Sequence, residues 1–153
     1  MKPHYQIARL ISAALLSLGI FATAAVATTT PARAAEPPIT LAQLAGPWAM
    51  TLTGDTGCGI TTLYVTFTLN TSGSGSATYV SHTSGCGDGR TTGVPFSIQS
   101  LNGNGSGTAN LSCGSGCGWN LNIQVAHNRQ IFNAVDVSSA NPGNFMEGSA
   151  IHQ

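Results

Sequence analysis

Cys113-Gly-Ser-Gly-Cys117-Gly-Trp119-Asn-Leu-Asn-Ile-Gln-Val125 is the stretch that decides the fold. Two cysteines flank a Gly-Ser-Gly link, and apolar residues then alternate with amide residues as far as Val125. A two-residue alternation is typical of a β-strand with one apolar face, and the glycines before it indicate a tight turn. The stretch therefore predicts a turn that leads into a half-buried strand.

The same alternation recurs along the chain, between clusters of Gly, Ser, Asn and Pro that favour turns. We expect a fifth strand through Ala109, Leu111 and Cys113, and a sixth strand formed by the stretch above. The other six strands are expected at about 48–53, 61–70, 76–82, 92–101, 131–137 and 145–152. Pro95 predicts an irregular start for the fourth strand. Residues 39–44 allow one short helical turn.

Short links between successive strands predict an antiparallel meander, because each strand can pair with the next. Eight such strands favour an all-β, up-and-down barrel, since closure leaves no unpaired edge strand. A two-sheet β-sandwich is the alternative. The side chains expected to face the interior are Trp48, Met50, Leu52, Leu63, Val65, Phe67, Leu69, Phe96, Ile98, Leu111, Trp119, Leu121, Ile123 and Val125.

The N-terminal segment is typical of an export signal. Lys2 and Arg9 precede an Ala/Leu/Ile-rich run, and small-x-small sites allow cleavage after Ala34 or after Ala27. The alternative is a membrane anchor. We predict a cleaved signal peptide at 1–34, an extended segment at 35–46 and a single barrel domain at 47–153. The protein would then be secreted or periplasmic, with no membrane contact after cleavage.

The charge balance excludes some classes of partner. Removing 34 of the 153 residues leaves 119, with Arg90 and Arg129 as the basic residues against all five carboxylates, a formal charge of −3. Two isolated arginines cannot neutralise a run of phosphates, so the sequence argues against binding to nucleic acid. No phosphate loop, serine elbow or zinc-protease helix is present, and no cofactor is predicted.

The four cysteines of an exported chain predict disulfide bonds. In an up-and-down meander, alternate links lie at the same end, which brings the loops of Cys58 and Cys86 together with the hairpin of Cys113 and Cys117. We favour the pairs Cys58–Cys86 and Cys113–Cys117, with the swapped pairings left open. A four-thiolate zinc site is the competing interpretation.

Most ionisable groups of the mature chain are predicted at this cysteine-bearing end. They could form a ligand- or partner-binding rim, or could simply be the charges that surface loops carry. The candidate rim residues are Asp55, His82, Asp88, Arg90, Asp136 and Glu147. No metal site is predicted, because His82 and the nearby carboxylates lack a recognised ligand spacing. Asp136 and Glu147 are the only pair considered for acid–base catalysis.

The opposite end is expected to be closed by Trp48, with Arg129 stacked over its ring as a cation–π plug. The triplet Gly46-Pro47-Trp48 resembles the Gly-x-Trp that opens the first strand of lipocalins and related barrels. That resemblance implies a barrel whose tryptophan closes one end, beneath an arginine, while the other end admits a ligand. The chain is shorter than lipocalins and lacks their C-terminal helix, so no ligand is carried over.

These features favour a non-catalytic binding protein that uses its cysteine-bearing end for a small ligand or an extracellular protein. One alternative is a structural or adhesive protein that forms homo-oligomers through its Thr- and Asn-rich outer faces. Another is an inhibitor of an extracellular protease. A small hydrolase is the least favoured interpretation.

Overall fold

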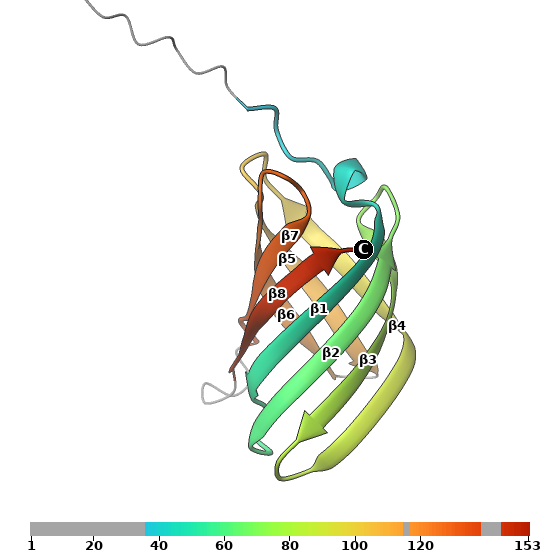
Figure 1. Cartoon of the computed structure of the whole chain (residues 1–153), viewed down its shortest axis with the longest axis vertical. Helices are drawn as coiled ribbons and strands as arrows, with labels where there is room; N and C mark the ends of the chain where they lie inside the picture. The colour runs from blue at the N-terminus through green and yellow to red at the C-terminus, as the bar shows by residue number, and fades with distance from the viewer. Residues whose placement is uncertain (1–35, 115–116, 139–144) are drawn as a thin grey trace, which may run out of the picture. The chain divides into compact units, whose positions relative to one another are not determined.

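Eight antiparallel strands form a closed barrel in strict sequence order, with β1 also pairing with β8 (Figure 1). The computed structural model describes residues 36–114, 117–138 and 145–153. The elements are a 3-10 helix η1 (Leu41–Leu44), β1 (Gly46–Asp55), β2 (Ile60–Leu69), β3 (Ser74–Thr83), β4 (Gly87–Leu101), β5 (Ser106–Gly114), β6 (Cys117–Val125), β7 (Ile131–Asp136) and β8 (Phe145–His152). The predicted barrel is confirmed, and the two-sheet sandwich is excluded.

The strand bounds agree with the sequence pattern except at β4. The expected start at residue 92 was wrong, because β4 begins at Gly87 and pairs with β3 from Gly87 to Ser97. The irregularity predicted from Pro95 lies nearby, where the β3–β4 register shifts between Ala77 and Tyr79. The short helical turn expected within 39–44 is η1.

The interior is filled with apolar side chains that alternate with outward polar ones. In β2 the burial pattern alternates without interruption from Ile60 to Leu69, because the side chains of a strand point to opposite faces in turn. Aromatic rings of Trp48, Phe67, Phe96 and Phe132 pack together, with Phe67 and Phe96 stacked at a centroid distance of 4.2 Å. An eight-stranded barrel has an interior that such side chains can fill.

All but one of the predicted interior residues are buried. Trp119 is the exception, because it is only half-buried and packs edge-on against Tyr79 with ring centroids 5.6 Å apart. Further strand side chains, which were not predicted from the sequence, complete the core, and they are Ala77, Tyr79, Val94, Ala109, Phe132, Ala134, Met146 and Ala150.

The N-terminal segment closes one end of the barrel. Ile39 and Leu44 are buried, and η1 lies over the end at which β1 begins (Figure 1). The indole Nε1 of Trp48 donates a hydrogen bond of 2.8 Å to the carbonyl of Leu44. The segment predicted to be extended therefore contains a helical turn that covers the core.

Candidate functional site

A disulfide bond joins two turns at the end of the barrel opposite to η1. Cys58 lies between β1 and β2, Cys86 lies between β3 and β4, and their Cα atoms are 5.6 Å apart. This pairing was the favoured one and is confirmed. Cys113 is also disulfide-bonded. The side chain of its predicted partner, Cys117, lies outside the described residues.

A cluster of threonine hydroxyls lies in the wall near this disulfide. The buried Thr61 hydroxyl lies 3.0 Å from that of Thr83 and 2.8 Å from that of Thr56. Each buried polar side-chain atom within the described residues has a hydrogen-bond partner. The described part of the cysteine-bearing end is thus held by a covalent bond and hydroxyl contacts, whereas the opposite end is held by apolar packing.

The candidate rim residues lie near this end, but several of them face outward from the wall. Five residues form one row of register partners across the wall. The row runs from Glu147 of β8 through Thr53 of β1, Thr62 of β2 and His82 of β3 to Asp88 of β4. All five side chains are exposed. Four strand spacings separate Glu147 from Asp88, about 19 Å along the wall. These groups therefore do not converge on one point.

The remaining rim groups have separate surroundings. The Asp55 carboxylate accepts a 2.7 Å hydrogen bond from the backbone N–H of Gly57. The Asp136 carboxylate accepts hydrogen bonds of 2.9 and 2.6 Å from the backbone N–H and the hydroxyl of Ser138. Arg90 is exposed on β4, opposite Val80. Asp88 pairs with the imidazole of His82 across the β3–β4 hairpin.

The two carboxylates considered for catalysis occupy opposite faces of the wall. Asp136 follows the buried Phe132 and Ala134 in the inward alternation of β7, whereas Glu147 is exposed on the outer face of β8. Within the described residues, no group of three His, Cys, Asp or Glu side chains could hold a metal ion.

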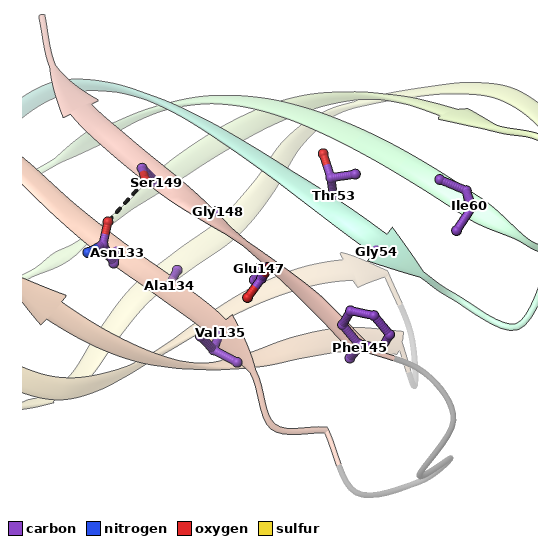
Figure 2. Close-up of a pocket in the computed structure, with 10 residues that line it drawn as sticks. All are labelled: Thr53, Gly54, Ile60, Asn133, Ala134, Val135, Phe145, Glu147, Gly148 and Ser149. Carbon is purple, nitrogen blue, oxygen red and sulfur yellow. Dashed lines mark hydrogen bonds between the residues drawn. The ribbon is translucent and has the colours of Figure 1, made fainter.

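A groove of about 670 Å³ lies on the outer wall where β7, β8, β1 and β2 approach the cysteine-bearing end (Figure 2). Phe145, Ile60 and Val135 supply its apolar lining and are 55%, 61% and 46% exposed. Glu147 lies among them, and no ion pair or hydrogen bond of its carboxylate is formed with another described residue. Asn133 and Ser149 hydrogen-bond to each other along one side, 3.0 Å apart.

The groove places Glu147, a predicted site residue, beside apolar residues that the sequence analysis missed. A signal for them existed in the sequence. In strands β7 and β8 both alternating sets contain large apolar residues, because Phe132 and Met146 face inward while Val135 and Phe145 face outward. A strand with two apolar faces inside a single-walled barrel must expose one of them.

At the closed end, the ring against Trp48 belongs to His152, which meets it edge-on at a centroid distance of 4.9 Å. Gly46 allows this contact, since its φ is +131° and a Cβ there would lie 2.6 Å from the His152 ring. The guanidinium of Arg129, predicted to stack on Trp48, donates hydrogen bonds to Gln43 and to the carbonyls of His127 and Pro37. Arg129 thus anchors the N-terminal segment.

No protein-family model matches the chain, and no curated protein is significantly similar to it. None of the helices in the described residues is long and apolar enough to cross a lipid bilayer. The fold and the site geometry are therefore the basis for a functional proposal.

Proposed function

We propose that this protein is an exported, non-catalytic binding protein that holds a protein partner at the cysteine-bearing end of its barrel. The observation that carries the proposal is the outer groove, in which the exposed Phe145 and Ile60 lie beside Glu147, whose carboxylate has no partner among the described residues. Exposed apolar side chains that cluster in a hollow are typical of an interaction site.

The groove favours a partner loop or extended segment that carries a large apolar side chain next to a lysine or arginine. The apolar side chain would pack on Phe145 and Ile60, and the cation would pair with Glu147. Four of the five carboxylates of the mature chain lie toward this end, with Arg90 as the basic counterpart. Long-range attraction would therefore favour a basic partner.

The rest of the molecule supports a rigid binding surface. The groove lies on paired strands rather than on a free loop, and the Cys58–Cys86 bond fixes the adjacent turn. A preorganised surface loses little conformational entropy when it binds. Because the interior is filled with apolar side chains, the partner would bind to the outer wall rather than inside the barrel.

We also propose that the chain is related to lipocalins. Gly46-Pro47-Trp48 begins β1, and Trp48 lies at the covered end of the barrel, as in those proteins. The ring that lies on Trp48 is a histidine rather than an arginine, which is a departure from that pattern.

Peptides of defined composition test the proposal by fluorescence anisotropy. One peptide set alternates Leu or Phe with Lys, and a matched set carries Glu in place of Lys. We expect the basic set to bind, and Phe145→Ser to weaken that binding about tenfold. Glu147→Gln should weaken the basic set alone.

Ile151→Ser is the matched control, because Ile151 is equally exposed on the same strand but lies outside the groove lining. It should leave the affinity unchanged. Equal binding of both peptide sets, or equal losses for Phe145→Ser and Ile151→Ser, would contradict the proposal.

A further inference from the structure

Among the described residues, the first half of β4 pairs with a strand on one side only. Gly87–Val94 pairs with Ala77–Thr83 of β3, whereas pairing with β5 begins at Phe96, opposite Leu111. Strand β5 ends at Gly114, which is already the register partner of Cys117 on β6. Within the described residues, no strand pairs with the outer edge of 87–94. Figure 1 shows this β3–β4 ribbon extending beyond the ends of β5 and β6.

An unpaired strand edge exposes alternate backbone N–H and C=O groups, which can pair with another strand. The usable length here is limited at one end by a β-bulge. The register shift sets Thr92 and Gly93 against Thr78, and Gly93 has a φ of +71°, which a bulge accommodates most easily with glycine. Pro95 lacks an N–H. The edge available for pairing is therefore 87–92.

The side chains on this edge form a self-complementary charge pattern. Asp88 and Arg90 flank Gly89 and are both exposed on the outer face of the ribbon, since residues two apart in a strand share a face. When two copies of this segment run antiparallel about Gly89, each Asp88 lies opposite the Arg90 of the other copy. Opposite charges in such cross-strand positions stabilise the pairing.

We propose that a second copy of this chain pairs with the β4 edge at 87–92, around a two-fold axis at Gly89. The two β3–β4 ribbons then form one four-stranded antiparallel sheet, and the barrels lie on either side of it. Because each ribbon extends beyond β5 and β6, the edges can meet without contact between the barrel walls.

The charge pattern also selects the register. Sliding one copy by two residues sets Asp88 opposite Asp88, or Arg90 opposite Arg90, and like charges directly opposite each other are destabilising. Arg90 forms no ion pair with another described residue, so its guanidinium is available to the second copy. The interface is small, and the dimer should therefore be weak and concentration-dependent.

Sedimentation equilibrium of the purified protein tests the proposal with a charge-swap series. Arg90→Asp sets a carboxylate of each copy opposite the Asp88 of the other copy. This repulsion should raise the dimer dissociation constant about tenfold. The double variant Asp88→Arg with Arg90→Asp restores complementarity and should recover dimerisation. A wild-type protein that is monomeric at all attainable concentrations, or a double variant no better than Arg90→Asp, would overturn the proposal.

Cross-linking gives a second, independent readout. Opposed residues in antiparallel strands have Cα atoms about 4.5–5.5 Å apart, which suits a disulfide bond. Gly89→Cys should therefore form a covalent dimer rapidly under mild oxidation. The control is Thr62→Cys, which places an exposed thiol on β2, away from the edge. Equal cross-linking rates for the two variants would refute the two-fold axis at Gly89.

The groove variants separate this inference from the proposed function. Phe145→Ser lies on β8 and should leave the dimer dissociation constant unchanged, because the groove and the β4 edge share no residue. A parallel loss of dimerisation in Phe145→Ser would place the contact between copies at the groove and would overturn the assignment to β4.

Discussion

The two ends of the barrel are closed by different kinds of interaction. At the end covered by η1, Trp48 and Leu44 are almost completely buried and pack with the aromatic core. At the other end, the Cys58–Cys86 disulfide joins two exposed turns above the Thr61 and Thr83 hydroxyls. One end is held by burial of apolar surface, and the other by a covalent bond.

The difference follows from what the chain supplies at each end. The N-terminal segment brings Ile39 and Leu44 as an apolar cover for the first end. At the second end, the described turns at 56–59 and 84–86 are short and bury little surface, and the Cys58–Cys86 cross-link joins them. The cysteine-bearing end is also where the groove and the β4 edge lie.

The largest effect is expected from Trp48→Ala. This substitution removes a fully buried indole, its packing on Phe132 and its hydrogen bond to Leu44. We expect the free energy of unfolding to fall by about 4 kcal/mol, as measured by urea denaturation.

Trp119→Ala is the matched control at the cysteine-bearing end. Trp119 is half-buried and contacts Tyr79. Its loss should cost about half as much, roughly 2 kcal/mol, because less apolar surface leaves the core. Equal losses for the two tryptophans would show that the ends do not differ in the way described.

A somewhat smaller effect is expected from the paired substitution of Cys58 and Cys86 by serine. The disulfide closes a sequence separation of 28 residues, and its removal should lower stability by about 3 kcal/mol. The loss should arise mainly from the unfolded state. The near-ultraviolet circular dichroism of the folded variant should therefore stay close to that of the wild type.

Stability is measured by a thermal melt of the double serine variant and by a second melt of the wild-type protein under reducing conditions. A transition temperature that does not change in either experiment would show that the cysteine-bearing end is held by its threonine contacts alone.

The contact between His152 and Trp48 allows a second test at the covered end. His152→Ala removes the edge-on ring and should reduce stability by about 1 kcal/mol. His152→Phe keeps an aromatic edge but loses the contact of Nε2 with the Ala45 carbonyl, 3.3 Å away. If ring packing dominates, the phenylalanine variant should recover most of the loss in a urea melt. A phenylalanine variant as unstable as the alanine one would assign the effect to the hydrogen bond.

Much of the fold could be predicted because the alternation of Leu63, Val65 and Phe67 with threonines allows only a strand. The start of β4 could not be. Gly87–Gly93 contains three glycines and an aspartate, which favour a turn by local preference, and pairing with β3 overrides that preference. Four of the eight missed core residues are alanines, whose burial depends on neighbouring strands rather than on their own hydrophobicity.

The candidate site could be predicted only in part. The alternation of links in a meander was enough to bring Cys58 and Cys86 together. Which face each charged residue occupies depends on register, and register set Glu147 outward and Asp136 inward. Register also placed His152, not Arg129, opposite Trp48 on β1. Sequence alone does not fix the pairing of the first strand with the last, because they are far apart in the chain.

The smallest effect on stability is expected from the charged surface at the cysteine-bearing end. Asp88 pairs with His82, yet both side chains are about three-quarters exposed. Exposed ion pairs contribute little, so Asp88→Asn should change the free energy of unfolding by less than about 0.5 kcal/mol in a urea melt.

The same variant removes the acidic half of the proposed β4 contact and should raise the dimer dissociation constant about threefold. Asp55→Asn is the control, since Asp55 lies at the same end but bonds its own turn at Gly57. A loss of folding stability in Asp88→Asn without weaker dimerisation would assign Asp88 to the fold. The opposite result would mean that its charge acts between molecules, because it contributes little within one.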